Sequence, residues 1–197
     1  MHKNFLHLIN TLDKGGTERI LTNLLKDSPK HFNHHIVCLS GNGILAKEIT
    51  DLGYEVTFLN LENKKRVFYS ISKLIILCYK IKPKVINAWM YHSCLLSILL
   101  SFIYTFRATV VWNIRNANLN ASLNPKTTIF IAKLNSFFSI FIKTIIYNSS
   151  FSKKLHSEIG YSNNKAKVLP NGFDCELFSP KNKKGLWKNK SENDICI

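Results

Sequence analysis

The chain has 197 residues and a mass of 22.6 kDa, enough for one large domain or two small ones. Hydrophobic residues make up 46% of it, and there are only eight glycines and five prolines. This composition predicts a packed core and excludes collagen-like and linker-like classes. The formal net charge of +15, from 27 Lys and Arg against 12 Asp and Glu, indicates an anionic partner.

Acidic residues are unevenly distributed. No carboxylate occurs between Glu62 and Glu158, so the 95 residues from 63 to 157 carry none, although they hold 14 Lys and Arg. A site built on two carboxylates is therefore excluded from the middle of the chain. Chemistry that needs a carboxylate is left to Asp13, Glu18, Asp174 and Glu176, or to a partner domain.

The cysteines and the N-terminus both predict a cytoplasmic location. The five cysteines form no CxxC pair and have no histidine at metal-ligand spacing, which argues against disulfides and structural zinc. The apolar residues at the N-terminus are interrupted by polar ones and followed by Asp13 and Lys14, unlike a signal peptide.

Apolar, β-rich runs alternate with runs of helical period. They predict strands at 4–9, 35–40, 55–59, 84–89, 109–114, 144–148 and 167–169. Between them they predict helices at 17–26, 44–52, 67–81, 93–106, 127–143 and 152–159. Thr17 is expected to cap the first helix, and Gly53 and Gly160 to end two others.

One stretch needs testing as a membrane span. The 22 residues of 85–106 contain no Lys, Arg, Asp or Glu, and their length would allow a span. Asn87, His92, three serines and a β-like beginning argue against it.

Strands separated by helices predict a parallel sheet, because each crossover returns the chain to the same edge. The expected fold is a Rossmann-like α/β domain over residues 1–180, an open parallel sheet with helices on both faces. The polar, Lys-rich residues 181–197 are expected to form a linker and the beginning of a further domain. In such sheets ligands bind beyond the carboxyl ends of the strands.

Two glycines, Gly15 and Gly16, lie between the first strand and the first helix. Backbone without side chains would let a phosphate reach the free N–H groups at the helix N-terminus. A tight turn that binds nothing is the alternative. The GxGxxG fingerprint of dinucleotide-binding proteins is absent.

Three further candidates follow strands. His92 could donate to a phosphate or a sugar hydroxyl, or simply cap or pack a helix. Trp89 could stack on a sugar, although a core position is the more ordinary role. Arg115 has the planar guanidinium that suits phosphate or carboxylate, or it is a plain surface residue.

The segment 127–145 is amphipathic when it is drawn as a helix. One face would carry Phe130, Leu134, Phe137, Phe138, Phe141 and Ile145. This face could pack on the sheet or enter a bilayer interface. Nucleic acid is a further anionic partner to consider, but no signature of a nucleic-acid-binding fold accompanies the lysines.

Two blocks of sequence resemble the family 4 glycosyltransferases: Gly15-Gly16-Thr17-Glu18-Arg19-Ile20-Leu21, and Val168-Leu169-Pro170-Asn171-Gly172-Phe173-Asp174 with Phe178 and Pro180. The lead-in Asn148-Ser149-Ser150, with His156 and Gly160, is also similar. Trp89-Met90-Tyr91-His92 and Trp112-Asn113-Ile114-Arg115 look like the branch that builds capsules, exopolysaccharide and lipopolysaccharide. The resemblance covers about residues 4–180.

The resemblance implies half of a GT-B enzyme, with the acceptor on this domain and the nucleotide-sugar donor on a second domain that the chain lacks. It implies transfer with retention of anomeric configuration and no metal or other cofactor. Gly15 and Gly16 would lie against the donor, with Thr17 to Arg19 behind them, and Thr17 and Arg19 would bind substrate. His92 would be catalytic and Trp89 close by, although the usual His-x-His of the strand end reads Asn87-Ala88-Trp89 here.

In the same resemblance Arg115 would bind substrate, and Asn171 and Gly172 would line the crossing between domains. The implied acceptor is a lipid-linked saccharide at the cytoplasmic face of the plasma membrane, whose anionic lipids would attract the basic chain. The alternative is a non-catalytic membrane-surface or scaffold module. A nucleotide-sugar epimerase or dehydrogenase is disfavoured by the missing glycine fingerprint and the missing Tyr-x-x-x-Lys pair.

Overall fold

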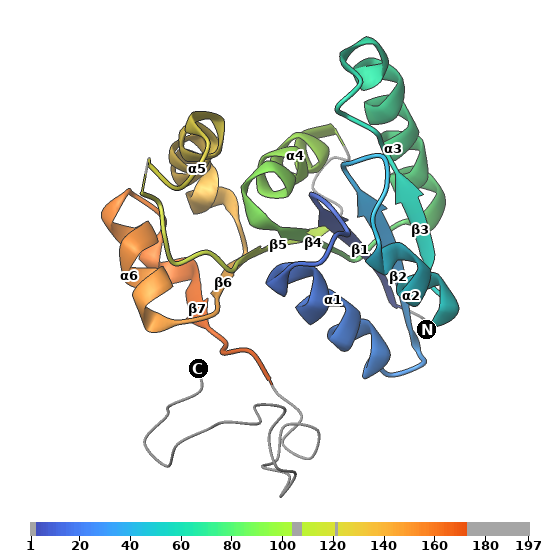
Figure 1. Cartoon of the computed structure of the whole chain (residues 1–197), viewed down its shortest axis with the longest axis horizontal. Coiled ribbons are helices and arrows are strands. Elements are labelled where there is room, and N and C mark those ends of the chain that lie inside the picture. Colours follow the sequence, from blue (N-terminus) through green and yellow to red (C-terminus); the bar gives the residue numbers. More distant parts are fainter. Residues whose placement is uncertain (1–2, 104–107, 121, 173–197) are drawn as a thin grey trace, which may run out of the picture.

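The computed structural model describes residues 3–103, 108–120 and 122–172. These residues form one sheet of seven parallel strands in the order β3-β2-β1-β4-β5-β6-β7 (Figure 1). The strands are β1 (Lys3–Ile9), β2 (Phe32–Cys38), β3 (Glu55–Phe58), β4 (Val85–Trp89), β5 (Thr109–Ile114), β6 (Thr144–Tyr147) and β7 (Ala166–Val168). The predicted α/β class is confirmed.

Six α-helices and three short 3₁₀ turns connect the strands within the described residues. The helices are α1 (Gly16–Lys26), α2 (Leu45–Asp51), α3 (Val67–Ile81), α4 (Met90–Ile103), α5 (Lys126–Phe138) and α6 (Ser150–Glu158). The 3₁₀ turns are η1 (Lys64–Arg66), η2 (Ser139–Phe141) and η3 (Asn163–Lys165).

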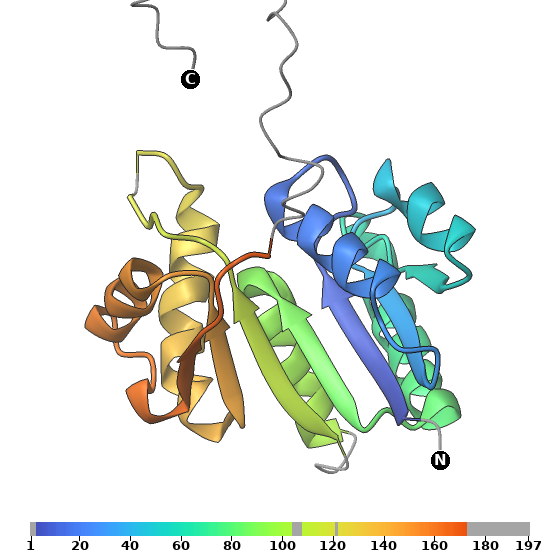
Figure 2. The ribbon, with the colours of Figure 1, turned by 90° about the horizontal axis from the view of Figure 1, so that it is seen from below.

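The helices cover both faces of the sheet, as a parallel sheet requires. A core that includes Leu21 and Leu25 of α1 and Ile49 of α2 fills one face. The larger core lies on the opposite face, beneath α3, α4 and α5. Figure 2 looks at the sheet from the α1 side and shows the segment after β7 crossing this face toward α1.

The N-terminus of α1 differs from the prediction. Its N-cap is Gly15, whose backbone is extended, and no side chain caps the helix. Thr17 is already the second helical residue, so the expectation that it caps α1 was wrong. Gly53 and Gly160 do follow helix ends, with φ of +89° and +100°. A left-handed residue of this kind ends a helix, and glycine adopts it without strain.

The helix predicted over 127–143 was too long, and its phenylalanine-rich face, for which packing on the sheet was one of two alternatives, is only partly buried. The α-helix α5 ends at Phe138, and η2 continues it. Its buried positions are Ala132 and Asn135, whereas Phe130 and Phe137 are 67% and 68% exposed. The Asn135 amide donates to the Tyr91 carbonyl at 2.8 Å, which turns the small and polar face of α5 toward α4.

The stretch 85–106, considered above as a membrane span, contains β4 and α4. Among the described residues, no helix combines the length and apolarity needed to cross a membrane. Cys38, Cys78 and Cys94 are buried free thiols. The predicted linker 181–197, the domain end at residue 180 and the block from Phe173 to Pro180 lie outside the described residues.

Candidate functional site at the carboxyl edge of the sheet

The strand order reverses between β1 and β4, which pair side by side in the middle of the sheet. The chain leaves β1 toward α1 on one face and leaves β4 into α4 on the other. The loops that follow two such strands diverge and leave a crevice at the carboxyl edge, where open α/β sheets bind ligands. Gly15 and Gly16 follow β1 and His92 follows β4, so all three belong to this edge of the sheet.

Gly15 and Gly16 leave the N-terminus of α1 uncovered. Both are exposed, and neither has a positive φ, so the backbone conformation does not require glycine here. A Cβ built on Gly16 meets nothing within 4 Å. The helix N-terminus is therefore open beside Gly16, whereas a Cβ on Gly15 would meet the Glu18 carboxylate.

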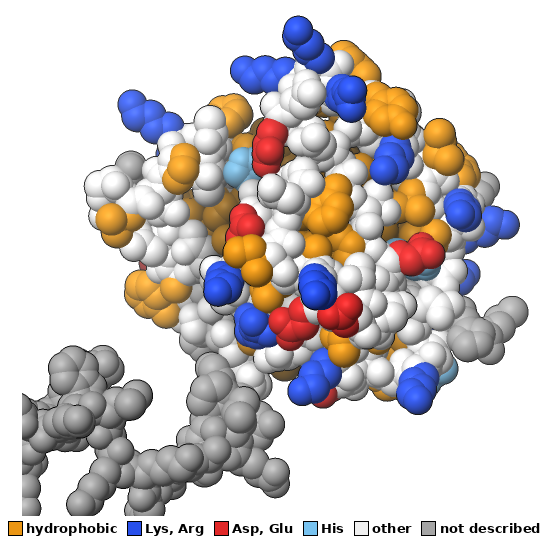
Figure 3. All heavy atoms as spheres, turned by 45° about the vertical axis from the view of Figure 1, so that its right-hand side comes forward, with side chains coloured by type: hydrophobic (Ala, Val, Ile, Leu, Met, Phe, Trp, Pro, Cys, Tyr) orange, Lys and Arg blue, Asp and Glu red, His pale blue; other side chains and the backbone are white. Residues whose placement is uncertain are grey.

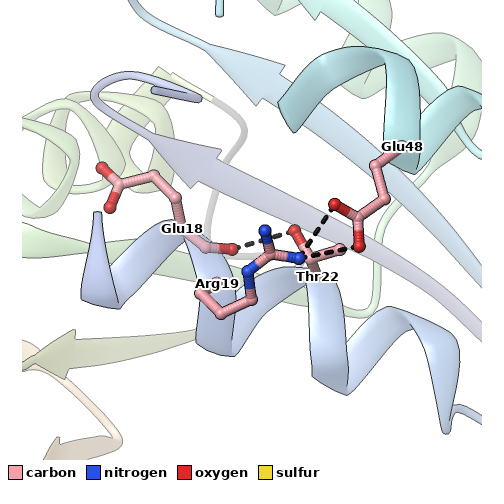
Figure 4. A network of polar contacts seen from close by, with 4 residues as sticks. All are labelled: Glu18, Arg19, Thr22 and Glu48. Carbon is pink, nitrogen blue, oxygen red and sulfur yellow. Dashed lines mark hydrogen bonds and ion pairs between the residues drawn. The ribbon is translucent and has the colours of Figure 1, made fainter. Parts of the chain in front are cut away.

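The two charged residues after the glycines point in different directions (Figure 4). The Glu18 carboxylate folds back over Gly15, where burial, with a smaller contribution from Asp13, raises its pKa. The Arg19 guanidinium lies 2.8 Å from both carboxylate oxygens of Glu48 on α2. Arg19, predicted to bind substrate, therefore ties α1 to α2 in this structure.

The loop before α1 is held by the loop before α2. The Leu45 N–H donates to the Leu12 carbonyl at 2.8 Å. Gly43 allows this approach, because a Cβ at that position would lie 2.5 Å from the Leu12 Cβ and 2.8 Å from its backbone. The β1–α1 loop is thereby fixed by contacts with a second strand end.

The junction between β4 and α4 has no loop residues. Met90, the first residue of α4, makes the turn with φ of +67°, a left-handed conformation that is uncommon for a side chain of this kind. The helix begins three residues earlier than predicted, so His92 lies in its first turn. His92 is half-buried, and burial lowers its pKa, which leaves the ring neutral at pH 7.

Arg115 is a cation without an acidic partner. Its guanidinium lies 5.5 Å from the centre of the Trp89 ring and donates to the amide oxygens of Asn113 and Asn171. Its Nε is buried with no partner, and neither of the two ion pairs among the described residues involves it. Burial lowers its pKa, and a nearby anion would offset that cost.

Trp89, Asn171 and Gly172, which were also predicted to bind substrate, differ in how they lie relative to Arg115. Trp89 is fully buried in the core next to α1, so it has no free face for a sugar and contacts the site through Arg115. Asn171 lies in the segment that crosses the sheet after β7 (Figure 2) and contacts Arg115. Gly172 is exposed at the end of that segment.

A chain of polar side chains leads away from Arg115 under α1, and sequence reasoning missed it. The Asn113 amide donates to Asn87, and the Asn87 amide lies 3.4 Å from the Nδ1 of His7. His7 in turn contacts His34 at 2.9 Å. The sequence contained a signal for this chain, because these polar residues occur inside otherwise apolar strands, where a buried polar group needs a hydrogen-bond partner.

His156, part of the motif lead-in, has a structural position. It is fully buried, with Nε2 2.8 Å from the Tyr91 hydroxyl and Nδ1 2.8 Å from the Ser152 carbonyl. Burial lowers its pKa. The residue joins α6 to the beginning of α4 and does not reach the crevice side of Gly15.

Comparisons with known proteins identify the family. The model of Glycosyltransferase Family 4 matches residues 14–177. The structure is similar to HepE of Anabaena in complex with UDP, with 19% identity and a TM-score of 0.71 over 91% of this chain and 47% of that one. No curated protein matched the sequence.

Two further solved structures are similar. A glycosyltransferase from Rickettsia africae has 16% identity and a TM-score of 0.66, over 93% of this chain and 46% of that one. The lipopolysaccharide outer core galactosyltransferase WaaB has 14% identity and a TM-score of 0.62, over 86% and 46%. The chain thus spans about half the length of these structures.

UDP-N-acetylglucosamine 2-epimerases, such as that of Rickettsia bellii with 12% identity and a TM-score of 0.59, share the fold as well. The family model matches 14–177, a range that includes Gly15–Leu21 and Val168–Asp174 of the two motif blocks. The chain belongs to Glycosyltransferase Family 4 and has the fold of one half of a GT-B enzyme.

Proposed function

We propose that this chain is the acceptor-binding half of a retaining glycosyltransferase. The enzyme would transfer a sugar from a nucleotide-sugar to a lipid-linked saccharide in the synthesis of capsule, exopolysaccharide or lipopolysaccharide. The observation that carries the proposal is the family match over 14–177. The similar HepE structures contain UDP and UDP-glucose, which supports a nucleotide-sugar as donor.

The crevice residues can be given roles in this reaction. Gly15, Gly16 and Thr17 would present the N-terminus of α1 to phosphate or to the transferred sugar. Arg115 would pair with a phosphate of a substrate, which would provide the charge that its surroundings lack. His92, neutral at pH 7, would hydrogen-bond the acceptor hydroxyl, and the donor phosphate would assist its deprotonation. The proposed transfer needs no metal, so EDTA should leave its rate unchanged.

The lipid-linked acceptor and a place at the cytoplasmic face of the plasma membrane are supported by the surface. Hydrophobic side chains lie among Lys and Arg on the face shown in Figure 3. Exposed aromatic residues include Phe68 and Tyr69 on α3 and Phe130 and Phe137 on α5. Cations beside exposed apolar groups are typical of surfaces that bind anionic membranes.

Calorimetric titration of the chain tests the proposal. We expect binding of a lipid diphosphate but none of UDP-sugars or GDP-sugars, whose site we assign to the second half. Tight binding of a nucleotide-sugar by this chain would overturn that assignment. Where sugar transfer is measured, the anomeric configuration of the product, read by NMR, tests retention.

The same surface favours one alternative, a non-catalytic module that holds a partner at the membrane. The variant His92→Ala separates the two. In an enzyme, the variant should abolish transfer measured together with the donor-binding half, while its binding to anionic vesicles is unchanged. A module has no transfer to lose.

A further inference from the structure

Four side chains with polar atoms lie side by side on the face of the sheet that α1 covers. The strand register brings them together, because His7 of β1 pairs with Asn87 of β4, and Trp89 of β4 pairs with Asn113 of β5. Arg115 follows two residues after Asn113, just beyond the end of β5. A row of polar atoms therefore crosses three strands and ends at the carboxyl edge.

The direction of every hydrogen bond in this row is fixed. The indole N–H of Trp89 can only donate, and it lies 3.3 Å from the Nδ1 of His7, which therefore accepts. The Asn87 amide nitrogen lies 3.4 Å from the same Nδ1 and donates to it. Asn87 then turns its oxygen toward the amide N–H of Asn113. The Asn113 oxygen in turn accepts from the Nη2 of Arg115 at 3.4 Å.

The position of one proton on His7 sets the orientation of the whole row. A proton on Nδ1 would face the indole N–H of Trp89, and both asparagine amides would have to turn over. Asn113 would then present its NH₂ group to the Arg115 guanidinium, which cannot accept a hydrogen bond. His7, fully buried on β1, thus decides which atom of Asn113 faces Arg115.

Neutral oxygens orient Arg115 without cancelling its charge. Its Nη1 donates to the side-chain oxygen of Asn171 and its Nη2 to that of Asn113. The buried Nε–H has no acceptor among the described residues. Arg19, by contrast, is paired with the Glu48 carboxylate (Figure 4). Arg115 therefore keeps its charge and part of its donor set for an anion.

The row is more than a way to fill space beneath α1. Polar atoms on a covered face cost free energy unless each finds a partner. Apolar side chains fill the same face without that requirement, as Ile9 and Ile36 do. Because the row ends at a cation on the edge of the sheet, the hydrogen bonds that satisfy it also fix the guanidinium.

We propose that His7, Asn87 and Asn113 are positioning residues, which hold the Arg115 guanidinium in one orientation for a phosphate of the substrate. They act through Arg115 and do not touch the substrate. This inference rests on the proposed function, since it takes Arg115 to bind phosphate. It adds the residues on β1, β4 and β5 that determine how this cation is presented.

Two substitutions of His7 separate positioning from packing. Asparagine places an amide oxygen where Nδ1 lies and keeps the acceptor, whereas glutamine places its amide where Nε2 lies and loses it. Both variants remove the buried imidazole, so both should be less stable than wild type. His7→Gln should weaken the binding of inorganic diphosphate about fivefold, as the loss of one hydrogen bond would, and His7→Asn should largely retain it. Calorimetry measures both affinities, and equal losses would overturn the proposal.

A double-mutant cycle tests whether Asn113 acts through Arg115. Asn113→Leu, of similar volume, should weaken diphosphate binding in the wild-type background but have no effect in the Arg115→Met background. An equal loss in both backgrounds would mean that Asn113 only supports the fold. Asn33→Ala is the control, because it removes an exposed amide that bonds Asn4 and should leave the affinity unchanged.

NMR of the arginine side chains tests the orientation without any ligand. The chain has four arginines, so ¹⁵N-labelled arginine gives few signals, and Arg115→Met assigns that of Arg115. A held guanidinium rotates slowly and keeps separate Nη signals. These should merge in His7→Gln and Asn113→Leu and stay separate in His7→Asn. Signals that are the same in wild type and in all three variants would overturn the proposal.

The outcomes for positioning and for the proposed function can be told apart. If Arg115→Met weakens diphosphate binding but His7→Gln and Asn113→Leu do not, the phosphate role is retained and positioning is overturned. If the Arg115 signals respond as expected but the chain binds no diphosphate, positioning is supported and the phosphate role of Arg115 is overturned.

Discussion

The tautomers of His7 and His34 follow from one neighbour. The indole Nε1 of Trp89 can only donate, and it lies 3.3 Å from the Nδ1 of His7, so that nitrogen accepts. The Nε2 of His7 must then carry the proton and donate to the Nδ1 of His34, whose Nε2–H donates to the Ser28 hydroxyl at 2.6 Å. A second proton on His7 would face the indole N–H.

Acid should therefore destabilise the fold. Burial, with His34 nearby, lowers the pKa of His7 from 6.5 to about 3. Between these pH values the unfolded chain binds a proton that the folded chain excludes, so stability falls as pH drops through this window. The loss is about 1.4 kcal/mol per pH unit for a fully buried histidine. Urea unfolding at pH 7.5, 6, 5 and 4 measures it.

Two histidine variants show which residue causes the pH dependence of stability. His7→Gln should give a less stable chain with a shallower pH dependence, since one titrating group is gone. The exposed His31→Gln is the control and should keep the full slope. A wild-type free energy of unfolding that stays constant from pH 6.5 to pH 4 would contradict the account.

The two arginines at the edge should differ in their effect on ligand binding. Arg115→Met should weaken diphosphate binding tenfold or more, because the Arg115 guanidinium pairs with no carboxylate among the described residues and is available to an anion. Arg19→Met should change it less than threefold, since Glu48 already occupies Arg19. Calorimetry with inorganic diphosphate measures both affinities. A larger loss of affinity for Arg19→Met than for Arg115→Met would contradict this assignment.

Loops at the element scale are held by local hydrogen bonds and by close contact. After β5 the side-chain oxygens of Asn116, Asn118 and Asn120 each accept from the backbone N–H two residues on, at 2.8–2.9 Å. Asparagines at every second position build these successive turns. The β1–α1 loop depends instead on Gly43, through its contact with Leu12.

Two glycine variants separate structure from access. Gly43→Ala should destabilise the chain by about 1–3 kcal/mol, because its Cβ would overlap the Leu12 backbone. Gly16→Ala should leave the free energy of unfolding within about 1 kcal/mol of wild type. It should nevertheless reduce ligand binding if phosphate approaches α1 closely. Chemical denaturation measures the stabilities and calorimetry measures the binding. A Gly16→Ala variant that is less stable than Gly43→Ala would refute the contact argument.

For the whole molecule, charge and exposed aromatic residues act together. The net charge of +15 attracts an anionic surface over a distance that salt shortens. Apolar side chains such as Phe130, Phe137 and Phe141 can then enter the interface. The helix packing decides that these groups are outside, since Asn135 and Ala132 occupy the side of α5 that faces the core.

Vesicle binding tests this property. The chain should sediment with vesicles that contain anionic lipid at low salt, bind less at 0.5 M salt, and ignore neutral vesicles. Phe130→Ser with Phe137→Ser should weaken binding without loss of stability, since both side chains are largely exposed. A chain that ignores anionic vesicles at low salt would rule out the membrane-surface hypothesis.

The succession of strands and helices could be predicted because it depends on local periodicity. Residues 67–81 and 109–114 were predicted with the bounds that α3 and β5 have. Errors of one to five residues occurred where a junction is decided by tertiary contacts, as at Met90, whose left-handed turn starts α4 without a loop. The motif blocks around Gly15 and Asn171 led to the family because a motif, like a period, is formed by neighbouring residues of the sequence.

The sequence by itself determined the α/β class, the parallel sheet and the family, and it led us to expect ligands at the carboxyl edge of the sheet. Only the tertiary structure decided that Arg19 pairs with Glu48, that Arg115 contacts Asn171, and that α5 turns Asn135 inward. These facts rest on contacts between residues 29 to 56 positions apart, which no short-range pattern encodes.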